Sequence, residues 1–227
     1  MVDVAEVMAE LEEAGTAQTR KIYARHGVTT PMFGVPYSVL RPLQKRLGID
    51  HDLALALWAT GNHDARVVAC EVVDRQRITA KLADAWVRDV DCYVIAGAVA
   101  GAVAGSPVAR SRSDAWRDRR GEWVASAGWG IVAGTAEDPA IWTVPELRAL
   151  LRQIEAEIRT RPHRVRHEMN GALIVIALRN GNLRRQAIAI ANRLGPLEVD
   201  HGETGCTTPD AVPYIERTLA HRARRAS

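Results

Sequence analysis

Four stretches of the chain, 64–74, 122–134, 164–177 and 183–195, mix small apolar residues with arginines and other polar residues at helical spacing. This spacing buries one face of a helix and leaves the opposite face in water. Short amphipathic helices that recur along a chain are typical of a helical solenoid, in which stacked neighbours bury a common core. We therefore predict an all-α protein built as an α-solenoid.

Glycines, prolines and capping residues divide the remaining sequence into further helices. No segment alternates apolar and polar residues over several positions, so no strand is predicted. Asn62 stands where an N-cap belongs, directly before one of the repeated helices. The helical pattern ends at Gly195, and the residues after it indicate a loop and one short helix. We predict one domain over residues 1–195, with residues 196–227 packed on it as an extension.

The composition is that of a globular protein with a packed core, since 47% of the residues are apolar and 25% are charged. The first residues are acidic and amphipathic, unlike a signal peptide, and the apolar run from Val94 is about half as long as a membrane-spanning helix. Cys70, Cys92 and Cys206 are too scattered to indicate a disulfide framework. These features predict a cytoplasmic protein, which we expect to be a monomer.

The positive charge is concentrated toward the C-terminus. Residues 159–227 hold twelve arginines against six acidic residues, whereas the rest of the chain has a net charge of −3. A basic bias of this kind favours a phosphate-bearing partner. Genomic composition could equally produce the bias, because arginine supplies 27 of the 30 basic residues. Solvated helix faces, which are commonly charged, could produce it as well.

Four segments carry a resemblance to a known family: 32–48 (MFGVPYSVLRPLQKRLG), 61–73 (GNHDARVVACEVV), 87–97 (VRDVDCYVIAG) with the helix that follows, and 121–134 (GEWVASAGWGIVAG). Over residues 1–195 the chain resembles the AlkD-type DNA alkylation repair proteins. The resemblance implies a right-handed α-solenoid of HEAT-like helix pairs whose concave face cradles duplex DNA. It further implies hydrolytic excision of positively charged alkylated purines, without metal or cofactor.

The chain departs from this family at the residues that would carry the chemistry. Cys92, Tyr93 and Ala96 stand where the family has aromatic and acidic side chains, and Ala125 and Ser126 replace a pair of arginines. A pocket tryptophan is also missing from residues 168–175. The catalytic residues are therefore unknown.

Two polar residues remain near the expected pocket. Asp91 and Tyr93 are the weak candidates for catalysis, since Asp91 could help to polarise a water molecule. Asp is also a strongly preferred N-cap residue, and Asp91 is predicted to cap the helix that follows it.

The predicted DNA contacts lie at helix starts and on basic helix faces. A helix start with an arginine, such as the one at His63 and Arg66, can bind a phosphate. Capping of that helix by Asn62 would also account for these polar residues. An asparagine in a groove can contact a base, or it can satisfy backbone groups between repeats. An exposed tryptophan can stack on bases, although tryptophans more often pack in cores. The predicted set is His63, Arg66, Trp123, Arg164, Arg166, Asn170, Arg184 and Arg185.

The loop after Gly195 concentrates reactive side chains, namely Asp200, His201, Glu203 and Cys206. They are candidates for binding another ligand, and Cys206 could be a nucleophile with His201 as its base. Their spacing matches no standard zinc pattern, so no metal is predicted. Hydrogen bonds from its own side chains could equally account for such a loop.

Together these features predict a protein that binds duplex DNA on a basic concave face and uses no cofactor. Whether it is an enzyme stays open; the activity implied by the resemblance is that of a DNA glycosylase, which hydrolyses the N-glycosidic bond of alkylated purines. One alternative is a HEAT-like scaffold for a protein or small-molecule partner. Another is an enzyme that uses the Asp200–Cys206 loop.

Overall fold

The computed structural model describes residues 3–226, and in that range it contains helices and no strands, which confirms the all-α prediction. The chain divides into two compact units, Met1–Arg112 with Gly202–Thr204 and Ser113–His201 with Gly205–Ser227. The domain boundaries expected from the sequence stay a prediction. No helix among the described residues has both the length and the apolar character needed to cross a membrane.

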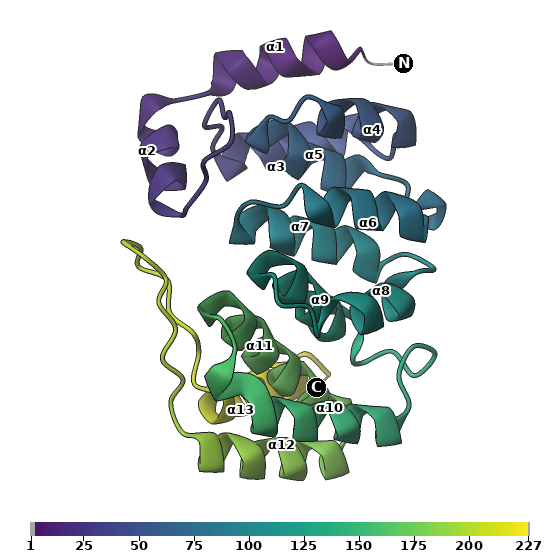
Figure 1. Ribbon diagram of the computed structural model, residues 1–227, viewed down its shortest axis with the longest axis vertical. Coiled ribbons are helices and arrows are strands. Elements are labelled where there is room, and N and C mark those ends of the chain that lie inside the picture. The colour runs from purple at the N-terminus through teal and green to yellow at the C-terminus, as the bar shows by residue number, and fades with distance from the viewer. Residues whose placement is uncertain (1–2, 227) are drawn as a thin grey trace. The chain divides into compact units, whose positions relative to one another are not determined.

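The first unit is made of stacked helix pairs. Helix α4 packs on α5, and α7 packs on both α5 and α6 (Figure 1). Leu11, Leu40, Leu57 and Ile95 fill its core and are less than 2% exposed. The unit contains α1 Val4–Ala14, α2 Ala17–Arg25, α3 Tyr37–Leu47, α4 His51–Ala59, α5 His63–Val72, the 3-10 helix η1 Arg75–Arg77, α6 Ala80–Arg88 and α7 Tyr93–Ala104.

Helix α8, Ala109–Trp116, crosses from the first unit into the second. Within the second unit, α11 is the central helix, because it packs on α9, α12 and α13. Trp129, Trp142, Ile154 and Met169 lie in the core of this unit. The remaining helices are α9 Glu122–Thr135, α10 Val144–Glu157, the 3-10 helix η2 Ile158–Thr160, α11 His163–Arg179, α12 Gly181–Leu194 and α13 Ala211–Ala226.

Short polar side chains begin many of these helices. The amide oxygen of Asn62 accepts a hydrogen bond from the backbone N–H of Ala65 at 3.2 Å, which confirms the predicted N-cap of α5. Thr143 and Glu146 form a capping box at the start of α10. Other side-chain caps are Asp3, Thr16, Asp50, Thr79 and Asn180.

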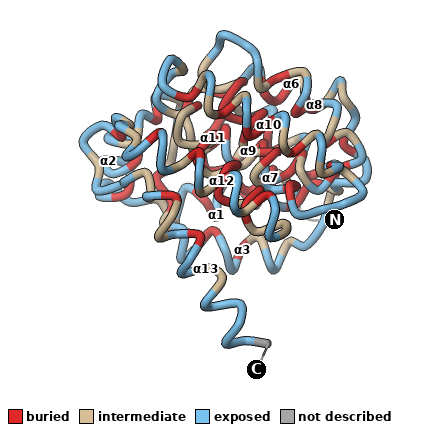
Figure 2. Tube along the Cα trace, turned by 90° about the horizontal axis from the view of Figure 1, so that it is seen from below, coloured by how far each residue is buried: buried red, intermediate tan, exposed pale blue. Residues whose placement is uncertain are grey.

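The last helix is longer than the sequence pattern predicts. Helix α13 runs for 16 residues, whereas we expect only a short helix in this part of the chain. Ala211, Ile215 and Leu219 recur at helical spacing and join the core of the second unit, which stabilises the first turns of the helix. Its last turns are exposed (Figure 2).

Candidate functional site

The buried carboxylate of Asp64 holds the loop that precedes α3. Asp64 is 0% exposed, and its two oxygens accept hydrogen bonds from the backbone N–H groups of Phe33, Gly34 and Val35 at 2.7, 3.0 and 2.9 Å. Gly34 has a φ of +77°, and a Cβ there would lie 2.5 Å from the side chain of Arg20. The Phe-Gly-Val segment therefore needs both its glycine and the distant Asp64.

His63, the neighbour of Asp64, is packed inside the first unit. Its side chain is 1% exposed, and neither ring nitrogen has a hydrogen-bond partner within residues 3–226. Its ring centroid lies 5.2 Å from that of Tyr23. Burial lowers the pKa of His63, so the imidazole is held neutral. The DNA contact proposed for His63 stays a prediction.

Arg66 is matched by groups of its own unit. Its Cζ lies 4.9 Å from the centroid of the Trp58 ring, and its Nη1 donates a hydrogen bond to the backbone oxygen of Asp89 at 3.2 Å. Trp58 stacks on Trp86 with a centroid distance of 4.4 Å and donates its indole N–H to the Asp89 carboxylate. The cation–π contact and an ion pair of 3.6 Å between Arg66 Nη2 and the Asp89 carboxylate fix the Arg66 side chain, whose contact with DNA also stays a prediction.

Asp91 and Tyr93 both interact with the segment that follows α2. The hydroxyl of Thr29 donates to Asp91 at 3.4 Å, and the hydroxyl of Tyr93 is hydrogen-bonded to His26 Nδ1. Helix α7 begins at Tyr93 with Cys92 as its N-cap residue, so the prediction that Asp91 caps this helix is wrong. The physical reason is that the Asp91 carboxylate faces Thr29 and lies one residue too early.

Helix α7 itself carries no carboxylate from Tyr93 to Ala104. Its exposed positions include Gly97 and Gly101, where an added Cβ would meet no atom within 4 Å. Ala96, which stands where the resemblance places an acid, is 1% exposed. The exposed side of α7 therefore offers backbone and small side chains, without an acidic group.

The first half of α11 binds the segment that follows α12. His163 accepts the backbone N–H of Asp200 at 2.9 Å, and Asn170 donates to the backbone oxygen of Pro209 at 2.9 Å. Arg166 donates to the backbone oxygen of Glu198 at 3.3 Å. Arg166 and Asn170, which we predict to contact DNA, thus help His163 to hold Glu198, Asp200 and Pro209 against α11. Contact of Arg164, Arg166 and Asn170 with DNA stays a prediction.

Four side chains form a directional hydrogen-bond chain at this junction, which we call the α11 latch: Arg164, His201, Thr208 and His167. Arg164 Nη1 lies 2.9 Å from His201 Nδ1, and because arginine can only donate, Nδ1 must accept. His201 then donates from Nε2 to the Thr208 hydroxyl at 2.9 Å, and that hydroxyl donates to His167 Nδ1 at 2.9 Å. Burial lowers the pKa of both histidines, and Arg164 adds to the effect, since a protonated ring would lose its acceptor nitrogen.

Most of the other candidates are more accessible. Trp123 is half-buried, Arg184 is half-buried, and Arg185 is exposed and hydrogen-bonded to Asn182. Glu203 and Cys206 are exposed, whereas His201 is 7% exposed. A hollow of about 470 Å³ is lined by residues 197–201 and 206–208 together with His163. No group of three or more metal-ligating side chains occurs in the part of the chain that the structure describes.

The family model described as DNA alkylation repair enzyme matches residues 7–215. The chain belongs to the DNA alkylation repair enzyme family. The predicted resemblance is thereby confirmed.

Related proteins and a solved structure have nearly the same length as this family member. An uncharacterized protein of Listeria innocua is 26% identical, and one of Listeria monocytogenes is 25% identical; each match covers 96% of this chain and 97% of the relative. The chain is also similar to a solved structure described as a new family of proteins related to the HEAT-like repeat DNA glycosylases with affinity for branched DNA structures. That likeness has a TM-score of 0.86 and 27% identity, and it covers 97% of this chain and 95% of the other. The HEAT-like fold is therefore confirmed.

One carboxylate of this family member, Glu168, was missed by reasoning from the sequence. Glu168 is half-buried on α11, one helical turn after Arg164, and shares a partly exposed stripe with Gly171 and Val175. Burial raises the pKa of Glu168 to about 7, opposed by the positive charge of Arg164. Its i, i+4 spacing from Arg164 was the available signal. A carboxyl group with this pKa changes charge near neutral pH, which is the property of a group used in binding or proton transfer.

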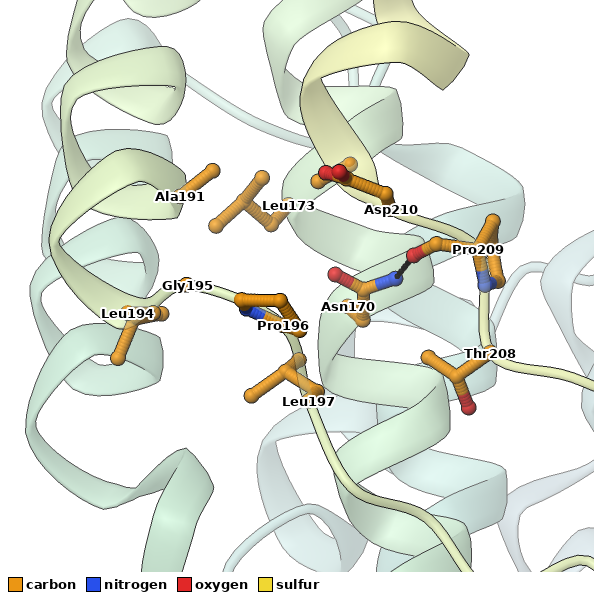
Figure 3. A pocket seen from close by; sticks show the side chains of 11 residues that line it. Asn170, Leu173, Ala191, Leu194, Gly195, Pro196, Leu197, Thr208, Pro209 and Asp210 are labelled. Atoms are coloured by element: carbon orange, nitrogen blue, oxygen red, sulfur yellow. Dashed lines mark hydrogen bonds between the residues drawn. The ribbon is translucent and has the colours of Figure 1, made fainter.

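A small pocket lies beside Asn170 in the same unit of this repair-family protein. Its volume is about 150 Å³, and the amide oxygen of Asn170 faces it while the amide nitrogen bonds Pro209 (Figure 3). Leu173, Leu194 and Leu197 form apolar walls. Asn170 is 3% exposed, so it serves the junction with the C-terminal segment.

We expect acid to open the α11 latch. Because the folded-state pKa values of His167 and His201 are lowered, the latch is intact above about pH 6.5 and is lost as the pH falls below that value. Each histidine contributes at most about 1.4 kcal/mol per pH unit to that loss. Hydrogen exchange at pH 7 and pH 5, corrected for intrinsic rates, should show protection of residues 198–201 and of Thr208 at pH 7 only.

Thr208→Val provides the matched comparison, because valine keeps the shape of threonine but removes the hydroxyl that joins the two histidines. In this variant, protection should already be low at pH 7 and change little at pH 5. Equal protection of the wild-type segment at both pH values would contradict the latch.

Proposed function

We propose that this family member binds DNA through the arginine-rich second unit and does not excise bases. Membership of the DNA alkylation repair enzyme family supports a DNA partner. The affinity for branched DNA stated for the similar solved structure supports the same partner. The proposal that the protein does not excise bases rests on the absence of any carboxylate on α7, Tyr93–Ala104.

Charge supports the location of the DNA-binding surface. Residues 159–227 hold twelve arginines and six acidic residues, so they carry an excess of six positive charges. Arg184 and Arg185 lie on α12 without a carboxylate partner among the described residues. Arginines that are not neutralised within the protein remain available to bind DNA phosphates. When they bind, they release the counterions that surround the DNA, so the affinity falls as the salt concentration rises. Duplex binding on a concave face stays a prediction.

The residues around α7 and α9 argue against excision. Excision of an alkylated purine, the reaction that the resemblance implies, produces positive charge on the sugar, and a nearby carboxylate stabilises this charge. Loss of that carboxylate typically lowers the rate by several orders of magnitude. Asp91 is engaged by Thr29, and Ala125 and Ser126 are 1% and 3% exposed on α9. None of these three residues presents an exposed charge to a substrate.

The test is incubation with DNA that contains 7-methylguanine or 3-methyladenine, scored for both binding and base release. We expect binding of duplex and branched DNA that weakens at least about tenfold between 50 and 200 mM salt, and no release above the uncatalysed rate. Binding that does not change with salt, or no binding at all, would contradict the DNA-binding proposal. Release of the alkylated base would contradict only the proposal that the protein does not excise bases.

One observation favours a second function, which is excision that uses Glu168. This carboxyl lies on the partly exposed stripe of α11 and has a pKa raised by burial to about 7. A carboxylate there could stabilise a cationic sugar if α11 faces the substrate. Base release by the wild type that disappears in Glu168→Gln, with binding retained, would establish this alternative.

A further inference from the structure

Helix α13 has a basic and aromatic face that none of the functions above uses. At about 100° per residue, six of its side chains fall within about one third of the helix circumference. Ala211 and Ile215 pack into the core of the second unit on a different face. We call these six residues the α13 face: Tyr214, Arg217, Thr218, His221, Arg224 and Arg225.

The α13 face is accessible and contains no acid. Five of its six residues are exposed, and Tyr214 is 43% exposed. The nearest acid on the helix, Glu216, lies outside this face. Arg222 is also outside it, and both of its terminal nitrogens bind the Glu137 carboxylate at 2.7 and 2.8 Å. The face therefore carries positive charge that no carboxylate on its own side of α13 offsets.

Tyr214 lies beside a cation and a hollow. Arg217 Cζ is 5.8 Å from the centroid of the tyrosine ring. Tyr214, Arg217, Thr218 and His221 line a shallow depression of about 220 Å³. An exposed aromatic ring among basic side chains is the arrangement with which proteins stack an unpaired base and hold the phosphates on either side of it.

Helix stability alone does not account for this face. Arginines in the last turn complement the helix dipole, which accounts for Arg224 and Arg225. The dipole effect falls off within one turn, so it does not account for Arg217 in the middle of the helix. Nor does it account for an exposed tyrosine. The family match ends at residue 215, so all of the α13 face except Tyr214 lies beyond it.

We propose that the α13 face binds a DNA strand at an unpaired base, with Tyr214 stacked on the base and Arg217, Arg224 and Arg225 on neighbouring phosphates. This inference rests on the proposed DNA binding and adds the place and the kind of DNA. The face extends over about 16 Å from Tyr214 to Arg225, at a rise of about 1.5 Å per residue. That length suits contacts with several phosphates of one strand.

The phosphate contacts are tested with Arg217→Ala/Arg224→Ala and a matched control, Arg41→Ala/Lys45→Ala. The control removes two positive charges from α3, in the other unit. Binding of a duplex with a single-stranded flap should weaken about tenfold in the α13 variant, and the slope of log affinity against log salt should decrease by about 1.5. The control should bind like the wild type.

Base stacking is tested separately with Tyr214→Ala and Tyr214→Phe. In Tyr214→Ala, the ratio of the affinity for flap DNA to the affinity for plain duplex should fall at least about fivefold. Tyr214→Phe should keep this ratio, since stacking needs only the ring. Equal losses in the α13 variant and the α3 control, or an unchanged preference in Tyr214→Ala, would overturn the inference while leaving DNA binding intact. Failure of the wild type to bind any DNA would overturn both.

Discussion

Replacing Asp64 with alanine is expected to lower the free energy of unfolding by about 3–5 kcal/mol. The carboxylate is 0% exposed and accepts three backbone hydrogen bonds from residues 33–35, at 2.7 to 3.0 Å. Hydrogen bonds to a charged group are stronger than neutral ones, and their removal would leave three backbone donors without a partner. The loop would lose the group that fixes its path between α2 and α3.

Urea denaturation of the wild type and the variant measures this loss, and Asp50→Ala is the matched control. Asp50 is also a helix-start carboxylate, but it accepts one backbone hydrogen bond, from Leu53 at 3.0 Å. Its removal should cost about 1 kcal/mol, the usual value of an N-cap. Asp64→Asn should fall between the two alanine variants. A loss below about 1 kcal/mol for Asp64→Ala would show that the loop holds its conformation without the carboxylate.

The helices could be predicted from the sequence because their signals are local. The N-cap of α5 depends on Asn62 and on a backbone group three residues later, so the sequence alone contains both partners. The same holds for the spacing of apolar residues, which determines the buried face of each helix. Family membership was predictable for a similar reason, since it rests on continuous segments such as 32–48.

The use of polar side chains could not be predicted, because their partners lie far away in the sequence. The pattern of α11 shows that Arg164, Arg166 and Asn170 share a polar region, but it does not show that residues 198–201 and 208–209 cover that region. Asp64 resembles an ordinary first-turn acid until the loop near Gly34 is placed against it. Such contacts depend on tertiary packing, which neither composition nor helical spacing reveals.

Errors at single residues have the same origin. Asp91 has the residue type of an N-cap, but its carboxylate contacts Thr29, 62 positions away, and α7 starts at Tyr93. Glu168 was missed because a lone acid on a basic helix resembles a surface residue. Its burial, which raises the pKa to about 7, comes from the surrounding structure.

Replacing Gly128 with alanine is expected to lower the free energy of unfolding by about 3 kcal/mol, at the upper end for an overpacked core. A Cβ at this position of α9 would lie 2.4 Å from the backbone nitrogen of Arg117 and 2.7 Å from its Cα. Backbone atoms cannot move aside as the end of a flexible side chain can. The same close approach allows the hydroxyl of Ser113 to donate to the backbone oxygen of Gly128 at 3.1 Å, so separation of α8 and α9 would break a buried hydrogen bond as well.

Gly171→Ala is the matched control, because Gly171 also lies inside a helix but an added Cβ would meet no atom within 4 Å. Alanine favours a helix over glycine by about 1 kcal/mol, so this variant should be more stable than the wild type. Thermal or urea unfolding of the two variants should thus give changes of opposite sign for the same chemical substitution. A loss in both would mean that helix α11 needs its glycine for another reason, and a gain in both would mean that Arg117 does not constrain α9.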